Sequence, residues 1–159
     1  MRLLRATSAE APGLAAAHAQ AFDAPWREDE FEDLLEGEGI FGFLAQDPDP
    51  CGMILCRVAG GEMEVLTLAV SPAARRQGMG GALLTAALNQ ARLMSAEAAF
   101  LEVAVGNPVA EALYAKAGFQ RAGVRRGYSD RGSAGLEDAV VMRLTLTQDA
   151  ASPYNPDSV

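Results

Sequence analysis

The sequence predicts one mixed α/β domain, built on a single central sheet of about seven strands flanked by about four helices. Three observations lead to this prediction. The 159 residues are enough for one domain. Half of them are hydrophobic and 21% are charged, which allows a packed core and excludes wholesale disorder. Hairpin signals fill the first half of the chain, whereas helical and strand patterns alternate in the second half.

The first half opens with a short strand over residues 2–6. Ser8 is a good N-cap for a helix that runs toward Phe22. A second helix is expected around Phe31, Leu34 and Leu35, which recur at helical spacing, and glycines at 37 and 39 end it. Strands follow over residues 40–45, 53–59 and 62–70. A turn cluster at 47–52 separates the first two of these strands, and a Gly-Gly turn at 60–61 separates the last two.

In the second half, helices are expected over residues 80–94 and 108–117, with a strand over 100–105 between them. Pro108 suits the first turn of its helix, and Gly118 suits the position after its end. Segments 119–126 and 139–146 can pair as late strands. We therefore expect one domain over residues 1–146. Residues 147–159 lack periodicity and carry two prolines, so we expect a disordered tail there.

Composition excludes several classes of protein. The formal net charge of −8 argues against direct nucleic-acid binding and favours cationic partners. The single histidine and two cysteines that form no CxxC pair argue against a metal site, so we expect no metal and two reduced thiols. No apolar run approaches the roughly 20 residues that span a bilayer, and the N-terminus lacks a secretory signal. We expect a cytoplasmic protein that does not bind membranes.

The most informative motif lies where the strand over 62–70 leads into a helix. Its residues are Arg75, Arg76, Gln77, Gly78, Met79, Gly80 and Gly81. Glycines allow close approach to the backbone, and a helix start offers unpaired N–H groups, so the turn can bind a phosphate or pyrophosphate. A P-loop would need a lysine after the glycines, and a dinucleotide fingerprint would need a further glycine. The turn could instead serve only tight packing between strand and helix.

The motif matches the pattern Arg/Gln-x-x-Gly-x-Gly/Ala and so resembles the pyrophosphate-binding signature of the GNAT acetyltransferase family. Residues 101–128, LEVAVGNPVAEALYAKAGFQRAGVRRGY, resemble the second half of the same family. The likeness is greatest to its RimI type, bacterial enzymes that acetylate the N-terminal alanine of a ribosomal protein. It covers residues 1–146. It implies acetyl-CoA as co-substrate and a sheet whose parallel central strands splay apart.

The resemblance also implies roles for particular residues. Glu102 would be the general base, although an ion-paired acid on an outer strand face is the alternative. Its apolar neighbours suggest a buried position, which would be costly for an acid without a function. Tyr114 would be the general acid toward the thiolate, or else a core aromatic. Asn107 would contact the cofactor, or else only cap its helix. Other cofactor contacts would come from the strand backbone at Leu68, Ala69 and Val70.

The acceptor side is implied in the same way. Its residues would be Phe22, Pro25, Trp26, Tyr128, Glu137 and Asp138. Trp26 could also be only a packing residue. The chain departs from the family pattern at Ser129, where a second tyrosine is common, at Gly106, and in a glycine-rich loop over 130–136. These departures keep open the acetylation of a small amine or a lysine side chain. A non-catalytic acyl-CoA-binding or interaction module also stays open, because the face of the first two helices and the acidic segment could be an interface.

Acidic residues are concentrated beside the expected acceptor loop. Residues 27–38 hold seven acids and one arginine, which gives −6 of the net charge of −8. The simple interpretation is a solvated helix face. We also consider that this segment attracts a basic protein N-terminus, such as that of a ribosomal protein. The sequence leaves the oligomeric state open, between a monomer and a weak homodimer.

Overall fold

A computed structural model describes residues 1–127 and 138–146. The strands are β1 (Arg2–Arg5), β2 (Ile40–Gln46), β3 (Pro50–Ala59), β4 (Glu62–Val70), β5 (Ala98–Ala104), β6 (Gln120–Arg125) and β7 (Ala139–Thr145). The α-helices in the described residues are α1 (Ala11–Ala21), α2 (Glu28–Leu35), α3 (Met79–Leu93) and α4 (Pro108–Lys116). Short 3₁₀ turns at Ser8–Glu10 and Pro72–Ala74 lead toward α1 and α3.

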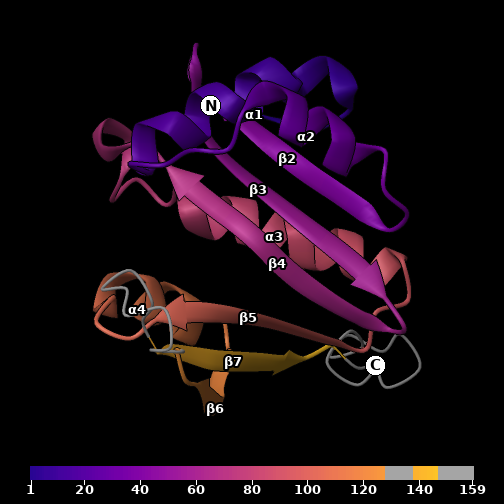
Figure 1. The fold of residues 1–159 in the computed structure, drawn as a ribbon, viewed down its shortest axis with the longest axis vertical. Helices are drawn as coiled ribbons and strands as arrows, with labels where there is room; N and C mark the ends of the chain where they lie inside the picture. The colour runs from indigo at the N-terminus through magenta and orange to yellow at the C-terminus, as the bar shows by residue number, and fades with distance from the viewer. Residues whose placement is uncertain (128–137, 147–159) are drawn as a thin grey trace, which may run out of the picture.

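All seven strands form one mixed sheet in the order β1-β2-β3-β4-β5-β7-β6. Strands β4 and β5 are the parallel neighbours, and the other described neighbours pair antiparallel. The parallel pairing covers only Glu62–Glu64 against Ala98–Phe100, after which the two strands separate (Figure 1). The expected mixed sheet with splayed central strands is confirmed.

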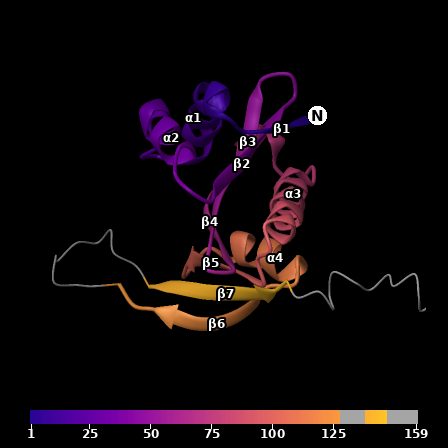
Figure 2. The ribbon, with the colours of Figure 1, turned by 90° about the vertical axis from the view of Figure 1, so that its right-hand side faces the viewer.

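Helices cover both faces of the sheet. Figure 2 shows α1 and α2 on one face, and α3 and α4 on the other. Each face has its own hydrophobic cluster. One packs Leu14 of α1 and Phe31 of α2 against β2, β3 and β4. The other packs Leu83 and Leu84 of α3, together with Tyr114 of α4, against the opposite side of the sheet. A three-layer domain results, with the splayed strands at its centre.

A bulge in β4 changes which residues face which layer. Leu55 pairs with Thr67, but the next residue, Cys56, pairs with Val65, so Leu66 is an extra residue in β4. Such an insertion reverses the inward and outward alternation beyond it. Val65 packs in the cluster under α3, whereas Thr67, two residues on, contacts α1. Without the bulge, both side chains would point toward α3.

Helix α1 begins differently from the sequence prediction. Thr7, rather than Ser8, caps the 3₁₀ turn that precedes it, because the Thr7 side chain accepts a hydrogen bond from the Ala9 amide. The Glu10 carboxylate returns a contact by accepting from the Thr7 amide at 2.7 Å. This reciprocal pairing is a capping box. Elsewhere the expected elements are present, with ends that differ by a few residues.

Candidate active site

Two adjoining cavities lie beside the separated parts of β4 and β5. The smaller has a volume of about 380 Å³ and the larger about 670 Å³. They share a set of lining residues, which are Phe22, Leu68, Asn107, Ala110 and Tyr114. Tyr114 and Asn107, which come from α4 and its cap, therefore stand where the two cavities meet. Ligands bound in the two cavities would face each other across this junction.

The larger cavity is bounded by the end of β4 and the start of α3. Gly78 caps α3 with φ of +78°, a left-handed conformation that glycine adopts without strain. A Cβ atom added at Gly78 or Gly81 would meet nothing within 4 Å, so the turn leaves room beside its backbone. The first N–H groups of a helix have no intrahelical partner. Together these features fit an anionic group, such as the pyrophosphate of acetyl-CoA.

Ten of the eleven residues assigned to the cofactor line this larger cavity. They are Leu68, Ala69, Val70, Arg75, Arg76, Gly78, Met79, Gly80, Gly81 and Asn107. Gln77 is the exception, and its side-chain amide donates to the Ala73 carbonyl at 3.3 Å. The Arg75 guanidinium donates to the last carbonyl of β4, that of Val70, at 3.1 Å. Asn107 also caps α4 by accepting from the Ala110 amide, so its two expected roles are compatible.

The smaller cavity contains Glu102, from the separated part of β5. The sequence argument that this acid is buried is wrong, since 39% of its side chain is exposed. Its neighbours Leu101 and Val103 are buried, because the strand alternates its faces. The Glu102 carboxylate accepts from the Arg125 guanidinium, with contacts of 2.7 and 2.8 Å. The acid is thus ion-paired, as one interpretation of the sequence expected, and it is also part of the cavity wall; its role as general base stays a prediction.

Tyr114 is almost fully buried, with 8% of its surface exposed. Its ring packs edge-on against Phe119 at a centroid distance of 5.8 Å. Burial is the main cause that raises the pKa of Tyr114 to about 12, and the nearby Cys56 thiol adds to the effect. The phenol therefore keeps its proton at neutral pH and can act as a donor where the two cavities meet. Tyr114 is both a core aromatic and a cavity residue, and its role as general acid stays a prediction.

The acceptor residues divide into three groups. Phe22 and Trp26 line the smaller cavity, as expected from the sequence. Pro25 is exposed and is not among the described residues that line either cavity. Its neighbour Ala24 lines the smaller cavity instead. Asp138 accepts from the Gly127 amide at 2.9 Å and joins the ends of the two late strands rather than lining a cavity. Tyr128 and Glu137 lie outside the described residues.

Among the residues of the smaller cavity that the sequence reasoning missed, two have polar side chains, His18 and Thr67. Both are buried, and the His18 Nε2 atom lies 3.1 Å from the Thr67 hydroxyl. A signal was present in the spacing, because His18 precedes Phe22 by four residues and so shares its helix face. Thr67 gave no such signal, because it reaches this face only through the bulge in β4.

Metal-dependent and thiol-dependent chemistry have less support in the described part of the chain. Residues 1–127 and 138–146 hold no group of three or more His, Cys, Asp or Glu that could bind a metal ion. Cys51 and Cys56 are free thiols on β3 and line neither cavity. Burial raises the pKa of both thiols, which disfavours the nucleophilic thiolate. No helix within these same residues is long and apolar enough to cross a membrane.

Comparison with known proteins identifies the family. Residues 8–119 match the model of the acetyltransferase (GNAT) family. The chain belongs to the GNAT acetyltransferase family. It is an acetyl-CoA-dependent N-acetyltransferase. The glycine-rich turn and both cavities lie within or directly beside the matched residues.

Two relatives of this GNAT enzyme indicate its type within the family. It is 33% identical over 124 residues to the ribosomal protein bS18-alanine N-acetyltransferase of Escherichia coli strain K12, covering 77% of this chain and 82% of that protein. It is 43% identical over 82 residues to N-alpha-acetyltransferase RimI of Mycobacterium tuberculosis, covering 52% and 48% of the two chains. The resemblance to the RimI type is thereby confirmed.

Solved structures support the same fold. The crystal structure of the E. coli ribosomal-protein-S18-alanine N-acetyltransferase has a TM-score of 0.78 and 28% identity, covering 92% of this chain and 95% of that one. The structure of Arabidopsis thaliana NAA60 in complex with acetyl-CoA has a TM-score of 0.76 and 16% identity, covering 91% and 97%. At that identity the second likeness speaks for the fold alone.

Proposed function

We propose that this enzyme acetylates the N-terminal α-amine of a protein, with the N-terminal alanine of a small-subunit ribosomal protein as its acceptor. The observation that carries the proposal is the pair of adjoining cavities, with Glu102 in one and Tyr114 in the lining of both. The E. coli relative supports the acceptor, because its name states alanine of ribosomal protein bS18.

In this proposal the larger cavity holds acetyl-CoA. The helix start at Gly78–Gly81 binds the pyrophosphate, and Arg75 and Arg76 add positive charge beside it. The backbone of Leu68–Val70 hydrogen-bonds the pantetheine arm, because the separation of β5 from β4 leaves this stretch without a paired strand on that side within the described residues. The acetyl group then lies near Tyr114, facing the smaller cavity.

The reaction is a direct attack within a ternary complex. The neutral amine attacks the thioester carbonyl, so that a C–N bond forms and the C–S bond breaks. Glu102 accepts the proton that the amine loses, directly or through one water molecule. Tyr114 donates its proton to the departing sulfur, which leaves as a thiol. Two cavities that bring both substrates to one junction supply the orientation that the transfer needs.

An N-terminal amine suits a base that is open to water. The reference pKa of an α-amine is about 7.7–8.0, against about 10.4 for lysine. At pH 7 the neutral form therefore costs about 1.0–1.4 kcal/mol for an α-amine and about 4.6 kcal/mol for a lysine. Because the neutral α-amine costs less free energy than a neutral lysine, a part-exposed and ion-paired carboxylate such as Glu102 can serve as its base.

The acidic residues of α2 support a basic acceptor. Glu28, Asp29, Glu32 and Asp33 are exposed on this helix, which begins two residues after Trp26 of the smaller cavity. Negative charge beside a cavity raises the local concentration of cationic ligands at low ionic strength. This location agrees with a ribosomal-protein N-terminus, which we expect to be basic.

The direct test uses acetyl-CoA and a peptide that copies the first residues of ribosomal protein bS18, starting with alanine. Acetylation of its α-amine, located by fragment mass spectrometry, is the expected result. Matched controls are the same peptide with a blocked N-terminus and an internal lysine, and a polyamine. Faster transfer to either control would refute the proposal and favour a lysine or small-amine acceptor. CoA binding without transfer to any amine would favour a non-catalytic module.

A further inference from the structure

His18 is a buried titratable residue that the reaction described above does not use. It lies on α1, is 2% exposed and lines the smaller cavity. Its Nδ1 atom accepts a hydrogen bond from the Trp26 backbone amide at 3.2 Å. A backbone amide can only donate, so Nδ1 carries no proton in this arrangement. The proton of the neutral ring is therefore on Nε2, which donates to the Thr67 hydroxyl at 3.1 Å.

The ring also stacks within a group of aromatic side chains. Its centroid lies 4.3 Å from that of Phe22 and 5.2 Å from that of Trp26, both nearly parallel to it. Phe31 of α2 meets it edge-on at 5.5 Å. Phe22 and Trp26 bracket the loop between α1 and α2, and both line the smaller cavity. His18 therefore connects this loop to β4 on the floor of the cavity.

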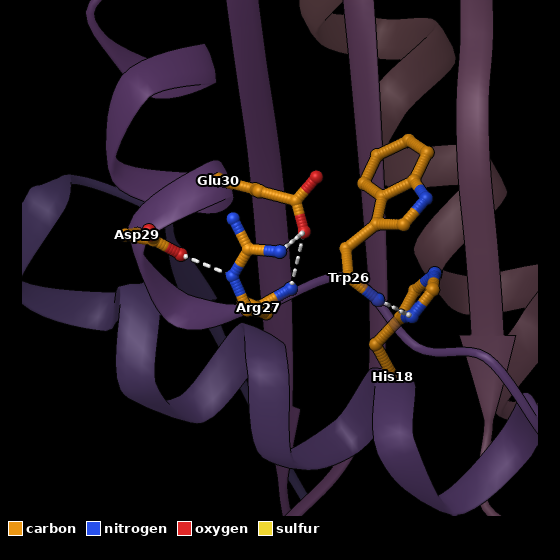
Figure 3. A network of polar contacts seen from close by, with 5 residues as sticks. All are labelled: His18, Trp26, Arg27, Asp29 and Glu30. Atoms are coloured by element: carbon orange, nitrogen blue, oxygen red, sulfur yellow. Dashed lines mark hydrogen bonds and ion pairs between the residues drawn. The ribbon is translucent and has the colours of Figure 1, made fainter.

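A second set of contacts fixes the loop where α2 begins. The Arg27 amide donates to the Glu30 carboxylate at 2.9 Å, and the Arg27 guanidinium donates to Asp29 at 3.1 Å. Figure 3 shows this network beside the His18–Trp26 contact. The network lies on the helix side of Trp26. Within residues 1–127 and 138–146, His18 is the residue that joins Trp26 to α1 by a hydrogen bond.

We propose that His18 is a positioning residue for the acceptor: its neutral ring holds the loop of Phe22–Trp26 against Thr67 of β4 and so shapes the acceptor side of the site. The inference rests on the proposed function in taking the smaller cavity as the acceptor side. Loss of the Trp26 contact should weaken acceptor binding more than acetyl-CoA binding, because His18 and Trp26 line only the smaller cavity, whereas Phe22 lines both.

Protonation of His18 would remove the acceptor for the Trp26 amide, since Nδ1 would then carry a proton. Burial lowers the pKa of His18, and the Glu30 carboxylate acts in the opposite direction. The other charged or titratable groups around it are Arg27 and Asp29 at the start of α2, and Glu102 and Tyr114 on the cavity wall. Burial is the largest effect, so the neutral form is favoured at pH 7.

Two substitutions separate the contacts of the two ring nitrogens. In His18→Asn the side-chain oxygen takes the place of Nδ1 and can accept from Trp26, while the contact with Thr67 is lost. In His18→Gln the side-chain amide takes the place of Nε2 and can donate to Thr67, while the contact with Trp26 is lost. Both variants place an amide of ordinary helix propensity in α1, so they serve as controls for each other.

We expect His18→Gln to raise KM for the acceptor peptide about tenfold, and His18→Asn to raise it less than about threefold. In both variants kcat and the Kd of acetyl-CoA should change less than about threefold. As the pH falls below 6.5, KM should rise more in the unsubstituted enzyme than in His18→Asn, because protonation of the acceptor α-amine affects both enzymes alike. Equal KM changes in the two variants, or a matching change in the Kd of acetyl-CoA, would overturn the proposal.

A spectroscopic measurement decides the same point without turnover. The sequence contains one tryptophan and one histidine, so the fluorescence of Trp26 reports on His18 alone among histidines. A protonated imidazole stacked on the indole should quench it, with a midpoint below 6.5 that is absent in both variants. Acrylamide should reach Trp26 more readily in His18→Gln than in His18→Asn. Equal accessibility of Trp26 to acrylamide in the two variants would overturn the proposal for His18, and this measurement needs no acetylation. A failure to acetylate any acceptor peptide would refute only the proposed function.

Discussion

Removal of the Tyr114 hydroxyl, in Tyr114→Phe, tests the proposed proton donor. Tyr114 is 8% exposed, and its ring packs edge-on against Phe119 at 5.8 Å. Phenylalanine keeps that ring and its packing, so the free energy of unfolding should change by about 1 kcal/mol or less. A lost general acid, in contrast, should lower kcat about 10²- to 10⁴-fold.

The pKa of Tyr114 sets the expected pH dependence. Burial raises it from 10.0 to about 12, which corresponds to roughly 3 kcal/mol against the ionised form. At pH 8 roughly one molecule in 10,000 would then be ionised at this residue. In the unsubstituted enzyme, kcat should show no alkaline decline due to Tyr114 up to about pH 10, where a tyrosine at its reference value of about 10 would already be half ionised.

The assay is steady-state kinetics from pH 6 to about pH 10, with acetyl-CoA binding measured by calorimetry and unfolding by denaturant titration. Phe119→Leu is the matched control, because it disturbs the same ring contact and leaves the hydroxyl in place. We expect that control to lose stability and to keep kcat within about threefold. A Tyr114→Phe enzyme with kcat near that of the unsubstituted protein would refute the assignment. So would a loss explained entirely by weaker acetyl-CoA binding.

Four further variants test other parts of the molecule. Glu102→Gln should lower kcat about 10²- to 10⁴-fold in the peptide assay, with acetyl-CoA binding unchanged. A smaller loss of kcat would show that a group other than Glu102 deprotonates the amine. Gly78→Ala forces a side chain into a left-handed conformation; it should cost about 1–2 kcal/mol in denaturant unfolding and weaken acetyl-CoA binding in calorimetry. Normal acetyl-CoA affinity there would argue against the turn as its site. Leu83→Ala removes a fully buried side chain and should cost about 2–5 kcal/mol in urea unfolding, whereas less than about 1 kcal/mol would contradict the close packing of α3. Glu32→Lys with Asp33→Lys should lower kcat/KM for a basic peptide about tenfold at low salt. This difference in kcat/KM should vanish near 1 M salt, where charges more than about 3 Å apart are screened. An unchanged kcat/KM at low salt would refute the attraction of the basic peptide by the acidic helix.

Residues whose role depends on local sequence were predicted well. The turn at Arg75–Gly81 combines glycines, a preceding strand and a following helix within one short segment, and all but Gln77 line the larger cavity. Tyr114 could be placed because its helix is defined locally by the Asn107 cap and the Gly118 end. Both positions follow from backbone geometry that neighbouring residues impose.

Residues whose role depends on distant partners were predicted poorly. The apolar neighbours of Glu102 suggested burial, but the strand beside it separates and Arg125, 23 positions later, pairs with it. His18 and Thr67 are 49 positions apart, and Thr67 reaches α1 only because Leu66 is an extra residue in β4. Such contacts depend on strand register and on how far strands separate, which a periodic pattern does not encode.

By itself, the sequence determined the mixed fold, the glycine turn, the two candidate proton-transfer residues and the family they resemble. The fold and the turn depend on hydrophobic periodicity and backbone conformation, which act over a few residues, whereas the two proton-transfer residues follow from the resemblance to the GNAT family. The tertiary structure alone decided where the strands separate, after Glu64 and Phe100, that two cavities meet at Tyr114, and that His18 joins the loop at Trp26 to β4. The physical reason is that burial, ion pairing and cavity shape arise only when distant segments pack together.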